Sequence, residues 1–209
     1  MNKKYIGLGC LGAVVLVVLV LFFWIKGAYN GMVETRENAK EAFSQIDVVL
    51  KRNFQQLNSL DNLLGREEEL IRGTLREVTE ARARATAINI DPSNCTPEQM
   101  KAWNQAQGDF SQALGRLMVA DENYPELRDL KAYQDVRDEL AGAVNRLAAA
   151  RSEYNRQAKE YNVRIQKFPN AIFAGMFGFQ PMFYYEAPAG TEENTTDFSK
   201  NKPGNSVVE

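Results

Sequence analysis

Residues 5–25 read YIGLGCLGAVVLVVLVLFFWI, a run of 21 residues without a charged side chain. An α-helix of this length is about 31 Å long, close to the thickness of the hydrocarbon core of a bilayer. Residues 1–4 form a short flank that contains Lys3 and Lys4, and Lys26 follows the run directly. The sequence therefore predicts one transmembrane helix over residues 5–25, with membrane lipid as its partner.

A cleaved signal peptide is the alternative interpretation of this run. Signal peptides have an apolar core of about 7–15 residues and end at a small-residue cleavage site. Here the run is longer and closes on Phe-Phe-Trp-Ile-Lys at residues 22–26, which favours a retained single-pass anchor. Lys3 and Lys4 slightly favour a cytoplasmic N-terminus with the domain outside the cytoplasm, although basic residues follow the run as well.

Composition excludes several classes of chemistry. The chain has no histidine, so it lacks histidine-based acid–base catalysis, nucleophilic triads and metal sites. The two cysteines, Cys10 and Cys95, lie in the membrane run and in a later loop, which prevents an intrachain disulfide. The net charge of −2 and the absence of a basic block argue against a nucleic-acid partner. We expect no catalytic, cofactor-binding or metal-binding residues, no cofactor, and no enzyme activity.

The rest of the chain is patterned for an all-α fold. Apolar residues recur at steps of three and four over residues 29–64, 66–88, 96–122 and 125–168. Short connections between such helices favour an up-and-down antiparallel bundle of four helices, which we expect over residues 28–186. A helix that continued through Gly65 would leave three long helices instead.

Two local signals support these helix boundaries. Thr96, Pro97 and Gln99 match an N-cap, a first helical position and the third position of a capping box. The last helix has a coiled-coil-like seam that Pro169 ends. The seam residues are Leu140, Val144, Leu147, Arg151, Tyr154, Ala158, Tyr161, Ile165 and Phe168.

Residues 168–185 are crowded with aromatic side chains. The candidate interaction patch consists of Phe173, Met176, Phe177, Phe179, Phe183, Tyr184 and Tyr185. Such a segment either folds back to cover one end of the bundle or contacts the membrane or another protomer. The polar residues 187–209 have too little apolar surface to offset their ordering entropy, so we expect a disordered tail.

Six ordered segments resemble the LemA family. They are QIDVVLKR at 45–52, VTEARA at 78–83, YPEL at 124–127, the Tyr-Asn pairs at 154–155 and 161–162, FP at 168–169, and AGMFGF at 174–179. The resemblance covers residues 29–187. It implies a membrane-anchored bundle of long helices in a bacterial envelope, from a family that is not known as an enzyme family.

A polar layer inside the bundle is the structural hypothesis for Gln45, Asp47, Arg82, Arg151 and Asn162. We expect Asp47 to pair with Arg82 or Arg151, because buried charges need partners and such pairs fix helix register. Gln45 and Asn162 would satisfy the remaining hydrogen bonds. The alternative is a ligand or ion site.

Two functions from different classes follow. The first is a non-enzymatic, membrane-anchored scaffold that self-associates or binds other membrane proteins. The second is an envelope sensor that recognises a small ligand or lipid between bundle helices. A sensor predicts a polar-rimmed pocket, whereas a scaffold predicts a filled core and external contacts.

Overall fold

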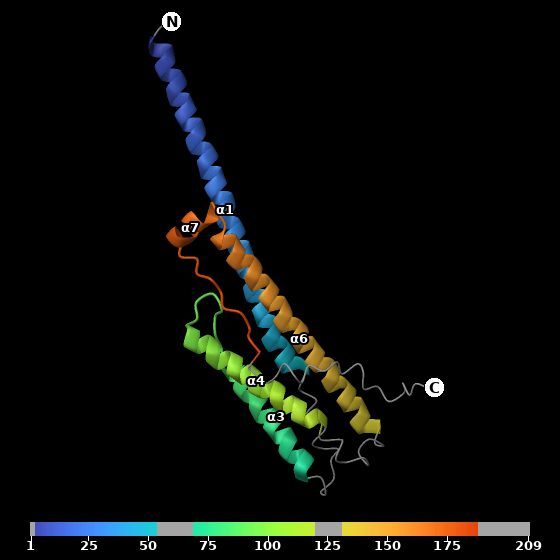
Figure 1. The fold of residues 1–209 in the computed structure, drawn as a ribbon. Helices are drawn as coiled ribbons and strands as arrows, with labels where there is room; N and C mark the ends of the chain where they lie inside the picture. The colour runs from blue at the N-terminus through green and yellow to red at the C-terminus, as the bar shows by residue number, and fades with distance from the viewer. Residues whose placement is uncertain (1–2, 54–68, 120–130, 188–209) are drawn as a thin grey trace, which may run out of the picture.

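The computed structural model describes residues 3–53, 69–119 and 131–187, and every regular element within these ranges is a helix. Figure 1 shows their arrangement. The elements are α1 (Lys3–Asn53), α3 (Glu69–Ala87), α4 (Pro97–Val119), α6 (Lys131–Gln166) and α7 (Asn170–Met176). The predicted all-α class is confirmed. The segment around Gly65, the predicted start of the last helix at Pro125 and almost all of the predicted tail lie outside the described residues.

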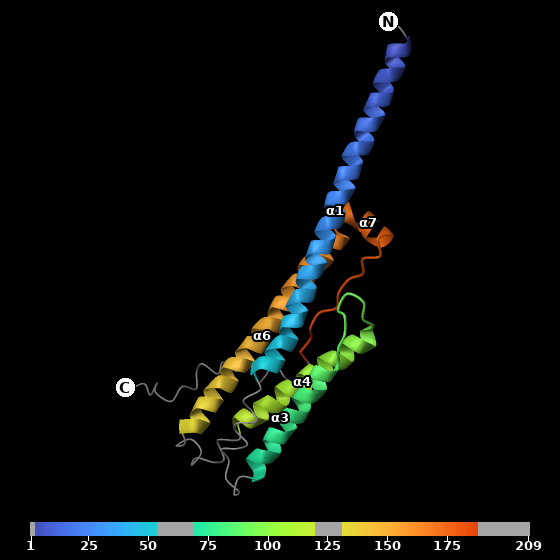
Figure 2. The ribbon, with the colours of Figure 1, turned by 180° about the vertical axis from the view of Figure 1, so that it is seen from behind.

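The four long helices alternate in direction and form two pairs. Helix α6 runs antiparallel to the C-terminal half of α1, and α3 and α4 form a second, shorter antiparallel pair (Figures 1 and 2). Contacts within each pair are far more extensive than those between α1 and α3. The predicted up-and-down topology is therefore present, with a looser junction between the pairs.

Helix α1 is one continuous element of 51 residues. Its length of about 75 Å includes the predicted anchor and the first helix of the bundle. Gly27 lies inside this helix, and a Cβ there would meet no atom within 4 Å. The side chains at 14–24 project away from the bundle, whereas Met32 and Ala39 are fully buried against it. The anchor thus enters the core without a break.

The core follows the predicted seam. On α6, Leu147, Tyr154 and Tyr161 are buried, and on α1, Ile46 and Leu50 are buried as well. The prediction that Phe168 continues this seam is wrong, because its side chain is 82% exposed. Helix α6 ends at Gln166, so the periodicity no longer sets the direction of residue 168.

The predicted start of α4 is confirmed in detail. The backbone N–H of Gln99 donates to Thr96 Oγ1 at 3.2 Å, and the backbone N–H of Thr96 donates to Gln99 Oε1 at 2.8 Å. Pro97 is the first residue of the helix. These reciprocal bonds satisfy donors that the first turn of a helix leaves without partners.

Candidate functional site

The chain reverses direction after α7. Gly178 has a φ of +73°, a left-handed backbone conformation that glycine adopts readily. The backbone N–H of Phe179 then donates to the carbonyl of Ala174 at 2.9 Å, which closes the end of α7. The following residues, 179–187, run back along the bundle toward α4 (Figure 1). We call this extended segment the strap.

Two asparagines of α6 bind the strap through its backbone. Asn162 donates to the carbonyl of Met182 and accepts from the N–H of Met182, both at 2.8 Å. Asn155 makes the same two bonds to Tyr185, at 2.9 and 2.8 Å. Each side-chain amide therefore pairs with the N–H and C=O of one strap residue, as the backbone of a neighbouring β-strand would. Because the asparagines are seven residues apart, both lie on the same face of α6.

The tyrosine before each asparagine adds a further bond. The hydroxyl of Tyr154 donates to the carbonyl of Phe183 at 2.5 Å, and that of Tyr161 donates to the carbonyl of Gln180 at 2.9 Å. Both side chains are fully buried, as their seam positions predict. Burial raises the pKa of both hydroxyls above the ordinary tyrosine value, so both stay protonated and able to donate.

The predicted aromatic patch does not form one surface. Phe179 is 6% exposed and packs on Tyr29 with ring centroids 5.7 Å apart. Tyr185 is half-buried between Trp103 and Arg151, with the Arg151 guanidinium 4.7 Å from the centre of its ring. Phe183 and Tyr184 of the strap are exposed. Every third strap residue, namely Phe179, Met182 and Tyr185, thus faces the bundle, and the residues between them face solvent.

Helix α7 carries the remaining patch residues beside the end of the anchor. Phe173 packs edge-on against Trp24 with ring centroids 5.8 Å apart, and Phe177 packs on Tyr29 at 5.0 Å. Exposed apolar side chains surround these contacts. They are Phe168, Ile172, Met176 and Phe177, which we call the α7 patch. The α7 patch lies beside the part of α1 where its apolar run ends (Figure 2).

The hypothesised polar layer is distributed differently. Asp47 forms an ion pair of 2.6 Å with Lys51, one turn along α1, and Gln45 is exposed. The expected pair between Asp47 and Arg151 does not form, because each group has closer partners of its own. Arg82 of α3 donates to the carbonyls of Leu50 and Lys51, both at 3.2 Å. Arg82 therefore joins the two helix pairs through backbone contacts.

Arg151 joins the pairs a second time. From α6 it donates to the side-chain oxygen and the carbonyl of Gln107 on α4, at 2.8 and 3.2 Å, and to Ser111 Oγ at 2.9 Å. Its side chain is buried, and burial lowers its pKa from the ordinary arginine value. Within the described ranges, no carboxylate lies within ion-pair distance of it.

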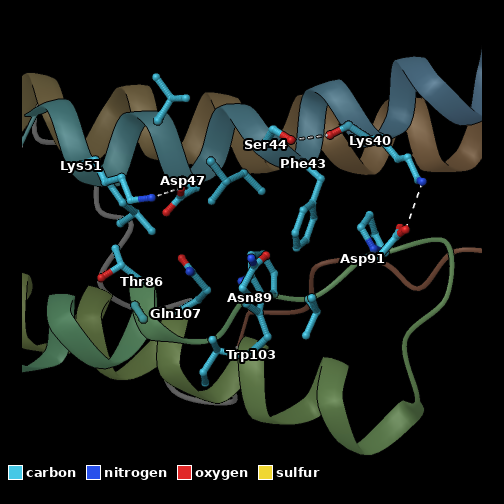
Figure 3. A pocket seen from close by; sticks show the side chains of 17 residues that line it. Lys40, Phe43, Ser44, Asp47, Lys51, Thr86, Asn89, Asp91, Trp103 and Gln107 are labelled. Carbon is cyan, nitrogen blue, oxygen red and sulfur yellow. Dashed lines mark hydrogen bonds and ion pairs between the residues drawn. The ribbon is translucent and has the colours of Figure 1, made fainter.

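A cavity of about 440 Å³ opens at the junction between the pairs. Its lining includes Phe43 and Asp47 of α1 and Trp103 and Gln107 of α4 (Figure 3), and the rings of Phe43 and Trp103 pack together with centroids 4.8 Å apart. Lys40 forms an ion pair of 3.0 Å with Asp91 at one end of the cavity, and the pair between Asp47 and Lys51 lies toward the other end (Figure 3). The described residues contain no group of three or more Cys, Asp or Glu that could hold a metal ion.

Sequence comparison identifies the family. The sequence pattern of the LemA family matches residues 42–198, a range that includes both Tyr-Asn pairs, α7 and the strap. The chain belongs to the LemA family. The family resemblance read from the sequence motifs is therefore confirmed.

Individual relatives are identical to this LemA-family protein at about a quarter of the aligned residues. Magnetosome protein MamQ of Magnetospirillum gryphiswaldense is 28% identical over 180 residues, which cover 78% of this chain and 66% of that protein. Magnetosome protein MamQ 2 of Paramagnetospirillum magneticum is 27% identical over 194 residues, covering 84% and 71%. Protein LemA of Metamycoplasma hominis is 24% identical over 155 residues, covering 74% and 67%. The chain thus matches about two thirds of the length of these curated relatives.

The anchor of this LemA-family protein has the properties of a membrane helix. In the described part of the chain, α1 is the one helix long and apolar enough to cross a bilayer, and none of its apolar window is buried inside the protein. Its apolar side chains from Val14 to Trp24 are between 46% and 65% exposed. Exposure of so continuous an apolar surface is favourable in lipid and unfavourable in water. The protein is therefore membrane-associated.

Sequence reasoning missed the role of the Tyr-Asn pairs. It placed both tyrosines in the core and Asn162 in a layer between helices, yet their polar groups bind the strap. One signal could have indicated this. An asparagine on a buried helix face needs partners for its amide, and a motif repeated after seven residues points to a partner that runs along the helix.

Proposed function

We propose that this protein is a non-enzymatic scaffold that stands on a membrane, with its N-terminus in the cytoplasm and its helical domain outside. It acts by binding neighbouring membrane proteins, including further copies of itself. The observation that carries this proposal is the continuity of α1 from the apolar run into the core. A continuous helix without a hinge transmits the orientation of the anchor to the bundle.

The α7 patch supports a second contact with the bilayer. Phe168 is 82% and Met176 is 75% exposed, so both present apolar surface that water solvates poorly. The contact between Phe173 and Trp24 places this surface beside the end of the anchor. Trp and Tyr are enriched at membrane–water interfaces, and Trp24 and Tyr29 of α1 pack on Phe173 and Phe177 beside this patch. Two contacts, α1 and α7, would restrict the tilt and rotation of the rod.

Fixed orientation favours scaffolding for an energetic reason. Molecules that are held in one plane with one face outward lose little further orientational freedom when they associate, so weak contacts suffice. The names of the relatives, magnetosome protein MamQ and protein LemA, are not enzyme names. They are consistent with an interaction role.

Crosslinking in cells, combined with sizing of the protein extracted in its native lipids, tests this proposal. In the sizing measurement, we expect assemblies larger than one chain. In cells, we expect crosslinks to the partners that these assemblies contain. Replacing Gly27 with proline breaks α1 between anchor and bundle and should reduce the crosslinks while membrane attachment persists. Gly27→Ala, which keeps the helix, is the matched control. A strict monomer without crosslinked partners would refute the scaffold.

Orientation has its own test. A phosphatase that is active only outside the cytoplasm, fused after the strap, should be active in cells. The same fusion with a fluorescent protein that folds only in the cytoplasm should be dark. The opposite pattern would reverse the proposed topology.

A further inference from the structure

We propose that Arg164 and Lys167, at the end of α6 beside the anchor, bind the headgroup phosphate of an anionic phospholipid. This site goes beyond the scaffold role and requires only that α1 lies in the membrane, so lipid binding and self-association are tested separately. It rests on the position of the Arg164 side chain, on the charge at this end of the bundle and on the height of the site above the apolar run.

Arg164 lies across the backbone of α1 at Gly31. A Cβ at residue 31 would overlap the Arg164 guanidinium, with the Cζ atom 2.6 Å away, and the three atoms nearest to such a Cβ all belong to Arg164. Glycine at this position therefore provides the space in which the side chain lies. The Nε atom of Arg164 is enclosed there without a partner, whereas its two terminal nitrogens are not enclosed.

The guanidinium of Arg164 has no acceptor within the protein. Among the residues that the structure describes, its side chain makes no ion pair, with Glu34 and Glu160 included. The hydrogen bond from Asn170 Nδ2, at 3.1 Å, goes to the backbone carbonyl of Arg164. The terminal N–H groups are therefore free to bind an acceptor from outside. The forked guanidinium suits phosphate, because two of its N–H groups can bind two phosphate oxygens.

Lys167 adds a second cation on the same side of α6. The N–H of Lys167 donates to the carbonyl of Val163 at 3.0 Å, so the helical turn continues to residue 167. Residues three apart on such a turn are neighbours, which brings Lys167 beside Arg164. Lys167 is exposed, and in the ranges 3–53, 69–119 and 131–187 it has no ion pair. An arginine and a lysine can thus bind one phosphate together.

This end of the bundle carries positive charge only. Residues 24–33 and 161–179 contain Lys26, Arg164 and Lys167 and no Asp or Glu. Basic side chains near a membrane surface attract anionic lipids, by about 1 kcal/mol for each residue. Because no acidic side chain lies in these two stretches, a lipid with net negative charge is favoured over a zwitterionic lipid.

The height of the site matches the headgroup layer. Gly31 lies six residues after Ile25, the last residue of the apolar run, which corresponds to about 9 Å along α1. Headgroups extend about 5–8 Å beyond each face of the hydrocarbon core. Arg164, which lies over Gly31, is therefore within the reach of a side chain from the lipid phosphates. Trp24 and Tyr29, of residue types that are enriched at membrane interfaces, occupy the same stretch of α1.

The experiment measures quenching of Trp24 fluorescence by phospholipids with brominated acyl chains. The full chain is reconstituted in phosphatidylcholine vesicles that contain the same fraction of brominated phosphatidylglycerol or of brominated phosphatidylcholine. Trp24 is 46% exposed at the end of the anchor, whereas Trp103 is buried on α4 and gives a constant background. We expect phosphatidylglycerol to bind beside Trp24 at least about fivefold more strongly, the factor for one basic residue at an anionic surface.

Variants locate the preference. Arg164→Gln combined with Lys167→Gln should bring the two lipids close to equal quenching. Arg146→Gln combined with Lys159→Gln is the matched control, because it removes two exposed cations of the same helix farther from the anchor and should keep the preference. Gly31→Ala keeps every charge but displaces the guanidinium, so it should reduce the preference as well. Equal quenching by brominated phosphatidylcholine in all variants shows that the anchor is inserted alike.

Four results would overturn the proposal. The first is equal quenching by both lipids in the natural protein, and the second is equal loss of preference in the control variant. The third is an unchanged preference in Gly31→Ala, which would indicate diffuse attraction. The fourth is loss of the preference on adding inorganic phosphate at constant ionic strength, which would assign the site to free phosphate. If Arg164 and Lys167 only offset the dipole of α6, their replacement lowers the melting temperature and leaves the lipid preference unchanged, which also contradicts the site.

Discussion

Asn162 and Met182 bind each other through two hydrogen bonds of 2.8 Å, one in each direction. The asparagine belongs to α6, and the methionine belongs to the strap, 20 residues later in the chain. Both bonds are buried, and Met182 is itself 2% exposed. A side chain thus provides the backbone pairing that a strand would receive in a sheet, and it holds the strap to the bundle.

Replacing Asn162 with leucine should detach this part of the strap. The variant loses two hydrogen bonds and leaves the N–H and C=O of Met182 buried without partners, which should cost about 3 kcal/mol of unfolding free energy. Chemical denaturation measures the loss, and limited proteolysis should cut within residues 179–187 before it cuts the helices. Asn145→Leu, at an exposed position of the same helix, serves as control. Equal stability of the two variants would contradict the role of Asn162.

Stability should fall at alkaline pH because of the buried tyrosines. The pKa of Tyr154 lies above its ordinary value of 10.0, chiefly through burial, and that of Tyr161 is raised as well. The unfolded chain therefore releases these protons first. The stabilisation is complete below about pH 10 and is lost as pH rises through the folded-state pKa.

Replacing both tyrosines with phenylalanine should flatten this alkaline decline. It should also lower stability at neutral pH by about 2 kcal/mol, since two hydroxyl bonds to the strap are lost. Urea unfolding between about pH 8 and 11 measures both effects. Tyr184→Phe, which removes an exposed hydroxyl, is the control. An unchanged decline in the double variant would show that other groups cause it.

Arg151 should not tolerate lysine. Its guanidinium reaches Gln107 and Ser111 with two different nitrogens while its face lies against Tyr185. A lysine ammonium cannot keep that planar, forked geometry, so we expect a loss of about 2 kcal/mol in unfolding free energy. The control is Arg146→Lys at an exposed site of the same helix. Similar melting temperatures for both variants would count against a bridging role for Arg151.

Substitutions of Gly27 test whether α1 is one continuous helix or bends at this residue. Alanine there adds a Cβ to open space and should stabilise the helix by up to about 1 kcal/mol. Proline should kink or break the helix at a cost of about 3 kcal/mol or more and uncouple the bundle from the anchor. Distances between spin labels on either side of residue 27 report the result. A broad distance distribution in the natural protein would argue against a continuous α1.

Local patterns predicted the helices well. The capping residues Thr96 and Gln99 make the reciprocal bonds that their spacing implies. The seam of α6 predicted burial of Tyr154 and Tyr161, because steps of three and four fix which side chains share a face of a helix. These inferences succeed because they depend only on neighbours along one helix.

Contacts between segments were beyond the same reasoning. Asp47 pairs with Lys51 on its own helix, whereas the need of a buried charge for a partner suggested Arg82 or Arg151 on another helix. The spacing of the strap's apolar residues does not reveal its partner, because the hydrogen bonds that hold the strap are made by its backbone N–H and C=O groups to asparagines about 20 and 30 residues earlier. Continuity through Gly27 could not be predicted either, because glycine lowers helix propensity without forbidding a helix.

The central claim is that two membrane contacts, α1 and α7, hold the helical rod. Measuring the depth of α7 in the bilayer tests this claim most directly. Nitroxide labels at positions 172 and 176, both exposed on α7, and at the exposed position 146 are compared in nanodiscs by their collision rates with oxygen and with a water-soluble nickel chelate. We predict that oxygen collisions dominate at 172 and 176 and that chelate collisions dominate at 146. Chelate-dominated, water-like values at 172 and 176 would contradict the second membrane contact.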